Sequence, residues 1–511
     1  MANGILPSRR QFLLRVSAAA VVTAVRPVTG TTSNSSDAAS ILALSAAEAV
    51  RSIARGEIPA ERYSAVLLER CKAGKSLNAF ISLEPERVLK SARECDVRRR
   101  TGAKLGPLHG LPIPIKDSIN TKDYPTTAGT PALKHFRPAA DAPIVSIIRK
   151  AGGVILGKTN LHELSYGYTS NNPTFGAVHN PYDPTRIPGG SSGGTAAAVA
   201  AQMAPMGVAE DTEGSIRVPA ALCGIAGFRP STGRYPTEGS VPTTALFDQL
   251  GPEARSVADL ALFDSAVTGD SSPFVPVSLK GLRLGVVRSY WYTNLDPEVE
   301  RATALALTRL KDAGVTLIES DLSALPELAR TIELVTDPIC YYDSSRSLAR
   351  YLQKYNTGIS FDQLIAQANP DLQEIFKTYV MPGAPHAISE AKYREARDVH
   401  LPALRQSLHH YFATTAVAAI VFPASGIPAP HIGQLEVAIR GRNLSIDDIF
   451  SHTVAPCSTA GLPGLVIPIA RTTNGLPIAL EFDGPRGSDR TLLAVGLGIE
   501  NLFGRLPPPV I

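Results

Sequence analysis

The stretch Gly189-Gly190-Ser191-Ser192-Gly193-Gly194-Thr195 decides how this sequence is interpreted, together with the later stretch Glu210-Asp211-Thr212-Glu213-Gly214-Ser215-Ile216-Arg217-Val218-Pro219. Between these two turns lie an Ala/Val run at 195–201, which predicts a helix, and an apolar segment at 205–209, which predicts a strand. Glycine lets backbone amides approach a bound group closely. Successive free N–H groups form a concavity that binds a phosphate or a developing oxyanion. With serine hydroxyls in both turns, the composition indicates a reaction centre.

Three other interpretations of the first turn are disfavoured. A phosphate-binding loop needs a Lys followed by Ser or Thr after its glycines, and this turn has none. The run 189–193 formally matches a nucleophile elbow, but that elbow follows directly on an apolar strand, whereas 180–188 is broken by prolines. A flexible linker would not be followed at once by helical and strand-like apolar segments.

The two turns resemble the core of the amidase signature family, hydrolases that use a Ser–cis-Ser–Lys triad. The segments Gly110–Asp117 and Cys223-Gly224 also match, and all the segments occur in the family's order and spacing. The resemblance implies that Ser215 is the nucleophile, Ser191 the bridging serine on a cis peptide, and Lys116 the base. It covers roughly the whole chain from residue 40 to 505 and is greatest to mandelamide and indoleacetamide hydrolases.

The resemblance also implies further site residues. The backbone N–H groups of Thr212, Glu213, Gly214 and Ser215 would form the oxyanion hole. The loop from Tyr166 to Phe175 is expected near the substrate, and the variable helical region would shape the substrate funnel. The residues assigned to substrate contact are Tyr166, Thr169, Ser170, Asn171, Gly190 and Tyr341. No cofactor or metal is expected, because no His/Cys cluster has the spacing of metal ligands.

Lys116 can act as the base only if its surroundings keep its amine neutral. A serine hydroxyl is a poor nucleophile unless its proton is removed during attack. Lysine removes a proton only when neutral, and its reference pKa is about 10.4. Burial and the absence of a carboxylate partner would lower that pKa. We therefore expect Lys116 to be buried without a carboxylate beside it.

Two residues depart from the family pattern. Glu213 stands where the family most often has Gly, and Glu210 stands where it has Thr. A positive φ at residue 213 would strain a glutamate, and a carboxylate near an oxyanion would oppose its charge. A non-catalytic small-molecule binder with an amidase fold is therefore kept as an alternative.

Helices expected at 256–267 and 296–313 alternate with strands at 282–287 and 315–318, which indicates an α/β fold. Together with the resemblance, this predicts a large mixed, mostly parallel twisted sheet with helices on both faces. The expected domain runs from 40 to 505, with a variable helical region at about 325–412.

Four local expectations accompany the fold class. The segment 111–115 is expected to be a short edge strand, and 455–469 and 475–480 are assigned to the closing strands. Asp211 and Arg217 are expected to form a structural ion pair. The five cysteines are expected to be mainly buried apolar residues.

Residues 1–36 resemble a twin-arginine export signal followed by a flexible segment, because Arg9-Arg10 precedes a weakly apolar run. The run is too short and interrupted for a membrane span, so an exported, periplasmic protein without stable membrane anchoring is expected. The net charge of +4 comes from this segment, and no basic face indicates nucleic-acid binding. The expected partner is a small-molecule amide, and the sequence leaves a homodimer open.

The sequence thus predicts an amidase that hydrolyses the C–N bond of a small aryl or apolar acyl amide through an acyl-Ser215 intermediate, with esters or carbamates as side substrates. Besides the impaired binder, the alternative is an amidotransferase-type subunit that serves tRNA charging. Such a subunit would be cytosolic, and the export signal argues against it.

Overall fold

The computed structural model describes residues 32–511. Residues 1–31 of the predicted export signal and flexible segment therefore lie outside the described residues. Residues 1–40 and 41–511 are two compact units. The described part of the first unit is helical and belongs to α1 (Thr32–Ala43). Within 32–511, no helix is long and apolar enough to cross a membrane.

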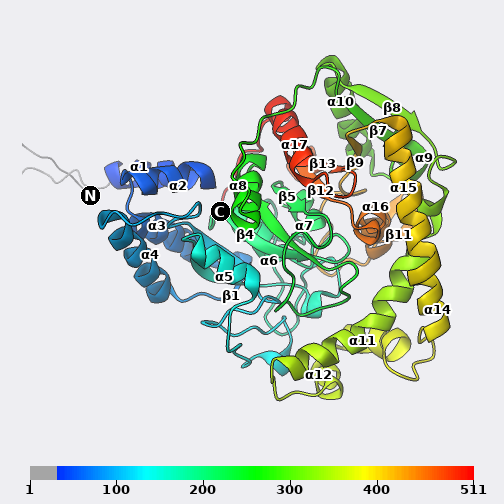
Figure 1. Ribbon diagram of the computed structural model, residues 1–511, viewed down its shortest axis with the longest axis horizontal. Helices are drawn as coiled ribbons and strands as arrows, with labels where there is room; N and C mark the ends of the chain where they lie inside the picture. Colours follow the sequence, from blue (N-terminus) through cyan, green and yellow to red (C-terminus); the bar gives the residue numbers. More distant parts are fainter. Residues whose placement is uncertain (1–31) are drawn as a thin grey trace, which may run out of the picture. The chain divides into compact units, whose positions relative to one another are not determined.

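An eleven-stranded sheet forms the centre of residues 41–511 (Figure 1). In spatial order its strands are β1 (Phe80–Ser82), β3 (Val154–Thr159), β2 (Pro112–Lys116), β4 (Met206–Asp211), β6 (Gln249–Ala254), β5 (Ala226–Arg229), β12 (Gly464–Arg471), β13 (Pro477–Asp483), β9 (Ala419–Pro423), β7 (Arg283–Val287) and β8 (Thr316–Ser320). β2 is parallel to β3 and β4, and β7 is parallel to β8 and β9. The other neighbours are antiparallel. The predicted α/β class with a large mixed sheet is confirmed. The sheet is not mostly parallel as expected, because antiparallel pairs occupy its middle and outnumber the parallel ones.

Helices cover both faces of the sheet, as predicted. On β12, Val466 packs in one apolar cluster with residues of α6 (Gly193–Ala200) and α7 (Arg217–Leu222). Its neighbours Leu465 and Ile467 face Gly496 of α17 (Asp489–Phe503). Successive side chains of a strand point to opposite faces, so α6 and α7 lie on one face and α17 on the other.

The remaining helices lie around these layers. The α-helices are α2 (Ala46–Arg55), α3 (Ala60–Ala73), α4 (Pro85–Arg100), α5 (Pro143–Lys150), α8 (Val257–Thr268), α9 (Arg288–Trp291), α10 (Pro297–Asp312), α11 (Asp337–Lys354), α12 (Phe361–Gln367), α13 (Pro370–Ile375), α14 (Glu390–Glu395), α15 (Leu401–Thr415) and α16 (Ile446–Ala460). The shorter helical turns are Lys75–Leu77, Pro131–Leu133, Glu163–Ser165, Pro326–Arg330, Ile332–Thr336, Phe376–Val380 and Ala396–His400. A separate hairpin pairs β10 (Glu436–Ile439) with β11 (Arg442–Ser445).

Several helices begin where the sequence indicated. Ser45 and Glu48 form a capping box at the start of α2. Ser256 and Asp296 cap α8 and α10 with their side-chain oxygens. All five cysteines are buried and free.

The expectation of an edge strand at 111–115 is wrong. β2 lies between β3 and β4, and the outer strands are β1 and β8. Pro112 and Pro114 have no N–H to donate, which is why an edge was expected. The sheet accommodates them because pairing with β4 is reduced to the single bridge Ile115–Val208, and pairing with β3 shifts register between Ile113 and Ile115.

The assignment of 455–460 to a closing strand is also wrong. These residues are the last turns of α16, which contains Pro456 in its interior and ends at Gly461 with a φ of 78°. Residues 455–460 are buried on all sides, so tertiary packing outweighs the cost of a proline inside the helix. β12 starts only at Gly464, and β13 follows as expected.

Candidate active site

The sheet brings the two key segments together at one edge. Lys116 is the last residue of β2, and β4 ends at Asp211, directly before the second Gly/Ser turn. β2 and β4 are parallel neighbours, so their carboxyl ends meet at the same edge, where α/β proteins usually bind ligands. Lys116 is fully buried there, and its Nζ donates a hydrogen bond to Ser191 Oγ at 2.7 Å.

The first Gly/Ser turn adopts a geometry that only small residues permit. The Gly190–Ser191 peptide bond is cis. A Cβ on Gly190 would lie 2.7–2.9 Å from backbone atoms of residues 168–170, so a larger residue would force the loop away. Ser191 is held from the same side, because its carbonyl accepts hydrogen bonds from His162 N at 3.0 Å and Ser170 Oγ at 3.2 Å.

The second turn presents Ser215 to a cavity. Ser215 is 6% exposed and lines the cavity, and its hydroxyl forms no hydrogen bond with any described residue. No hydrogen bond therefore joins Ser215 to Ser191 in this structure. Gly214 has a φ of 91°, whereas Glu213 is not among the described residues with positive φ. The backbone strain considered for Glu213 is absent.

The backbone amides of this turn are not equivalent. Gly214 N donates to Asp211 Oδ1 at 2.8 Å. Among the described residues, the amides of Thr212, Glu213 and Ser215 have no acceptor. Of the four amides assigned to an oxyanion hole, three are therefore free to donate to a ligand.

The expectation that Lys116 has no carboxylate beside it is wrong. Glu210 Oε2 lies 3.4 Å from Lys116 Nζ. The same oxygen accepts hydrogen bonds from Ser118 Oγ at 2.8 Å and Ser165 Oγ at 3.1 Å. Burial lowers the pKa of Lys116, and the nearby Glu210 raises it, so that the net direction is downward. Glu210, one of the two residues that depart from the expected pattern, thus acts directly on the ammonium group.

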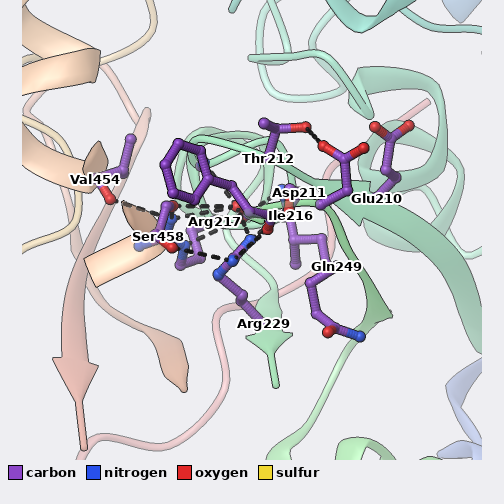
Figure 2. A network of polar contacts seen from close by, with 12 residues as sticks. Glu210, Asp211, Thr212, Ile216, Arg217, Arg229, Gln249, Val454 and Ser458 are labelled. Atoms are coloured by element: carbon purple, nitrogen blue, oxygen red, sulfur yellow. Dashed lines mark hydrogen bonds and ion pairs between the residues drawn. The ribbon is translucent and has the colours of Figure 1, made fainter. Parts of the chain in front are cut away.

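The predicted Asp211–Arg217 ion pair is part of a larger buried network (Figure 2). Arg217 Nη1 also lies 2.5 Å from Glu481 Oε1, and Arg229 Nη1 lies 2.9 Å from Asp211 Oδ1. All four side chains are fully buried. Burial alone raises the pKa of Asp211, but the two guanidinium groups outweigh it and hold that pKa well below its usual range. Because Asp211 also accepts from Gly214 N and Ile216 N, the network fixes the turn that carries Ser215.

A second buried ion pair supports β2 from its other side. Asp117 Oδ1, in the residue after Lys116, lies 3.0 Å from Lys158 Nζ. Lys158 also donates to Ile119 O at 2.9 Å and Thr126 Oγ1 at 2.8 Å. Sequence reasoning did not assign this pair, because a lysine on β3 gives no local signal of its partner.

The cavity at Ser215 has a volume of about 270 Å³. Of the six residues assigned to substrate contact, Tyr166 and Tyr341 line it, and the other four do not. Ser170 instead donates to Ser191 O and accepts from Gly193 N, Thr169 Oγ1 lies 3.2 Å from His162 Nδ1, Asn171 is exposed, and Gly190 packs against the 168–170 backbone. Ser170, Thr169 and Gly190 therefore hold the loop and the first turn in place.

Several lining residues were missed from the sequence. Glu213, assigned through its backbone, also contributes its side chain, as do Asp337, Asp447 and Asp448. The aspartates lie at the first turns of α11 and α16. Acidic residues are common there for helix stability alone, so no sequence pattern connects them with Ser215.

The sequence of this chain is similar to those of known amide hydrolases. The family model described as Amidase matches residues 65–493. An indoleacetamide hydrolase of Agrobacterium vitis is 38% identical over 436 residues, covering 85% of this chain and 91% of that protein. A mandelamide hydrolase of Pseudomonas putida is 35% identical over 459 residues, covering 86% of this chain and 88% of that protein.

A solved structure agrees with the sequence matches. A crystal structure described as an amidase superposes with a TM-score of 0.80 at 31% identity, covering 90% of this chain and all of that one. The family match spans well over half of the chain and includes both Gly/Ser turns and Lys116. The chain therefore belongs to the amidase signature family and is an amide hydrolase similar to the indoleacetamide and mandelamide hydrolases.

Proposed function

We propose that this enzyme hydrolyses a small aryl or apolar acyl amide through an acyl-Ser215 intermediate, with Ser191 and Lys116 moving the protons. The observation that carries the proposal is the buried hydrogen bond of 2.7 Å between Lys116 Nζ and Ser191 Oγ, beside a cavity in which the Ser215 hydroxyl has no protein partner. The tyrosines that line the cavity and the names of the aryl-amide relatives support the substrate class.

The acylation step moves one proton along the serines. Ser215 Oγ attacks the amide carbonyl carbon and passes its proton to Ser191 Oγ, whose own proton goes to neutral Lys116 Nζ. The tetrahedral oxyanion accepts hydrogen bonds from the free amides of Thr212, Glu213 and Ser215. Collapse breaks the C–N bond, and Ser191 gives a proton to the leaving nitrogen while Lys116 returns one to Ser191. The products of this step are acyl-Ser215 and ammonia or an amine.

Deacylation repeats the same path with water. A water molecule attacks the ester carbonyl, its proton passes through Ser191 to Lys116, and the Ser215 oxygen leaves and is reprotonated. The carboxylic acid departs and the free enzyme is restored. The missing hydrogen bond between Ser191 and Ser215 is compatible with this path, because catalytic hydrogen bonds in ligand-free enzymes are often long and tighten when substrate binds.

Covalent labelling tests whether Ser215 is activated. A serine-directed fluorophosphonate is expected to add one group to the wild-type chain, observed by intact-mass spectrometry and placed on Ser215 by peptide mapping. Ser215→Ala and Lys116→Ala should abolish the adduct. Ser192→Ala is the matched control and should label normally, because Ser192 is a buried serine next to Ser191 whose hydroxyl donates to Glu210 O. A folded wild-type protein that forms no adduct would favour the non-catalytic binder.

Replacing Glu210 with glutamine is expected to move the acid limb of the kcat/KM–pH profile to lower pH. Glu210 stabilises the charged form of Lys116 across 3.4 Å. Without that negative charge the pKa of Lys116 falls, so the neutral base is populated at lower pH. Asp211 acts on Lys116 in the same direction but more weakly.

Glu253→Gln is the control for that profile. Burial raises the pKa of Glu253 well above its usual value, and neither of its carboxyl oxygens has a hydrogen-bond partner. Glu253 is therefore expected to be neutral already, and its replacement should leave the acid limb in place. An unmoved limb in Glu210→Gln would show that Lys116 is not the group that titrates.

A further inference from the structure

The cavity at Ser215 carries an excess of negative charge. Four carboxylate residues line it: Glu213, Asp337, Asp447 and Asp448. Among the described residues, no lysine, arginine or histidine lines it. A neutral aryl amide has no charge to match this lining.

The carboxylates arrive from three separate elements. Glu213 lies in the turn after β4, Asp337 begins α11, and Asp447 and Asp448 lie in the first turn of α16. Asp447 and Asp448 are exposed, whereas Glu213 and Asp337 are half-buried. The fold thus collects acidic side chains around one cavity from positions far apart in the sequence.

Helix stability explains only part of this arrangement. Carboxylates in the first turns of α11 and α16 interact favourably with the helix dipoles. Glu213 is not in a helix, and its carboxylate accepts a hydrogen bond from Ser451 Oγ of α16. Burial, together with the like charge of Asp337, raises the pKa of Glu213 to about 7. The charged form of Glu213 is therefore disfavoured at this position, two residues before the nucleophile.

A metal ion does not account for the cluster. Within residues 32–511, no group of three or more carboxylate, histidine or cysteine side chains is placed to hold a metal. Among the described residues, the cation that acts on Asp337 is Lys392, on α14 outside the cavity lining. The negative charge inside the cavity is thus left without a counter-ion from the described chain.

Two other features point to an organic ligand. Ser215 is only 6% exposed. Its hydroxyl faces the cavity without a hydrogen-bond partner among the described residues, and it marks where a carbonyl carbon would lie. Tyr166, Tyr168 and Tyr341 line the same cavity, and tyrosine rings attract ammonium groups placed over their faces.

We propose that the substrate is a primary amide whose acyl part carries an ammonium group, which the carboxylates of Glu213 and Asp337 bind while the carbonyl lies at Ser215. This inference rests on the proposed function, because it assumes that the cavity at Ser215 is the substrate site. It narrows the aryl or apolar acyl class to members with a positive charge at the far end.

A pair of amides of equal size tests the charge preference. The probes are 4-(aminomethyl)phenylacetamide and 4-ethylphenylacetamide, which differ by an ammonium in place of a methyl group. Binding of both to full-length Ser215→Ala is measured by calorimetry, so that hydrolysis does not interfere. About one unit above the raised pKa of Glu213, the cationic amide is expected to bind at least about tenfold more tightly, as one charge-assisted hydrogen bond would give.

A second substitution in the Ser215→Ala background shows which carboxylates cause the preference for the cationic amide. Glu213→Gln and Asp337→Asn, each combined with Ser215→Ala, should reduce the ratio of the two dissociation constants towards one. Asp362→Asn is the matched control, because Asp362 also lies in the first turn of a helix but outside the cavity lining, and it should leave the ratio unchanged. High salt should reduce the ratio by screening.

A pH series gives a readout that does not depend on those variants folding. Glu213 faces Asp337 of α11, Asp211 of β4, and Tyr168 and Ser451. As the pH rises through about 7, Glu213 ionises, so the affinity for the cationic amide should rise while that for the neutral amide stays flat. A ratio of one or less, or a high ratio that neither substitution changes, would overturn the inference. Hydrolysis of 4-ethylphenylacetamide by wild type reports separately on the proposed function.

Discussion

Replacing Ser215 with alanine is expected to lower kcat/KM for an arylacetamide by about 10⁴- to 10⁶-fold, as removal of the nucleophile does in other serine hydrolases. The substitution removes the only atom that can form the acyl intermediate. The Ser215 hydroxyl has no hydrogen bond to a described residue, so its loss leaves no buried group unpaired. The free energy of unfolding should therefore change little, and loss of activity would not reflect loss of fold.

Further variants distinguish the roles of Ser191, Ser192 and Ser215. Ser191→Ala and Lys116→Met are expected to be nearly as inactive as Ser215→Ala, because groups that act as a unit are not additive. The double variant Ser191→Ala/Ser215→Ala should be no worse than either single variant. Ser192→Ala should lose less than about tenfold, since its hydroxyl donates only to a backbone carbonyl. Residual activity in Ser215→Ala within about tenfold of wild type would exclude the acyl-Ser215 mechanism.

Replacing Asp211 with asparagine is expected to lower the free energy of unfolding by about 3–5 kcal/mol, the usual cost of removing one partner of a buried ion pair. Asp211 neutralises Arg217 and Arg229, and all three side chains are fully buried. In the variant, Arg217 loses Asp211 and keeps Glu481 as its ion-pair partner, and Asp483 also acts on its charge. Urea denaturation monitored by circular dichroism measures the change.

The pH dependence and a surface control check the cause. The folded pKa of Asp211 is depressed, so its stabilising effect is present above the unfolded pKa of about 3.9 and is lost as the pH falls towards the folded value. The difference between wild type and Asp211→Asn should therefore shrink below about pH 4. Glu390→Gln, which breaks an exposed ion pair with Arg394, should cost less than about 1 kcal/mol. Equal losses in the two variants would contradict the assignment.

Much of the fold could be predicted from local patterns. The Ala-rich run after the first turn became α6, and the helices expected at 256–267 and 296–313 became α8 and α10. Apolar segments flanked by turns became β4, β7 and β13. These features depend on side chains a few residues apart, which a sequence displays directly. The predictions of an edge strand at 111–115 and of a closing strand at 455–460 were wrong. The free-energy cost of the prolines in these segments is offset by packing against segments that are distant in the sequence.

The sequence by itself determined the α/β class, because it follows from alternating helix and strand patterns. The motifs at Lys116 and in the two Gly/Ser turns carried the resemblance to the family, and that resemblance implied that Lys116 and Ser191 act together. Only the tertiary structure decided what surrounds these groups. Glu210 lies 3.4 Å from Lys116, Glu481 reaches Arg217, and the carboxylates of α11 and α16 meet Glu213 at one cavity. These contacts join elements of different strands and helices, and their charges act through a buried, low-dielectric interior. Their effect on the pKa of Lys116 and Glu213 depends on distances that are set by packing of the whole chain.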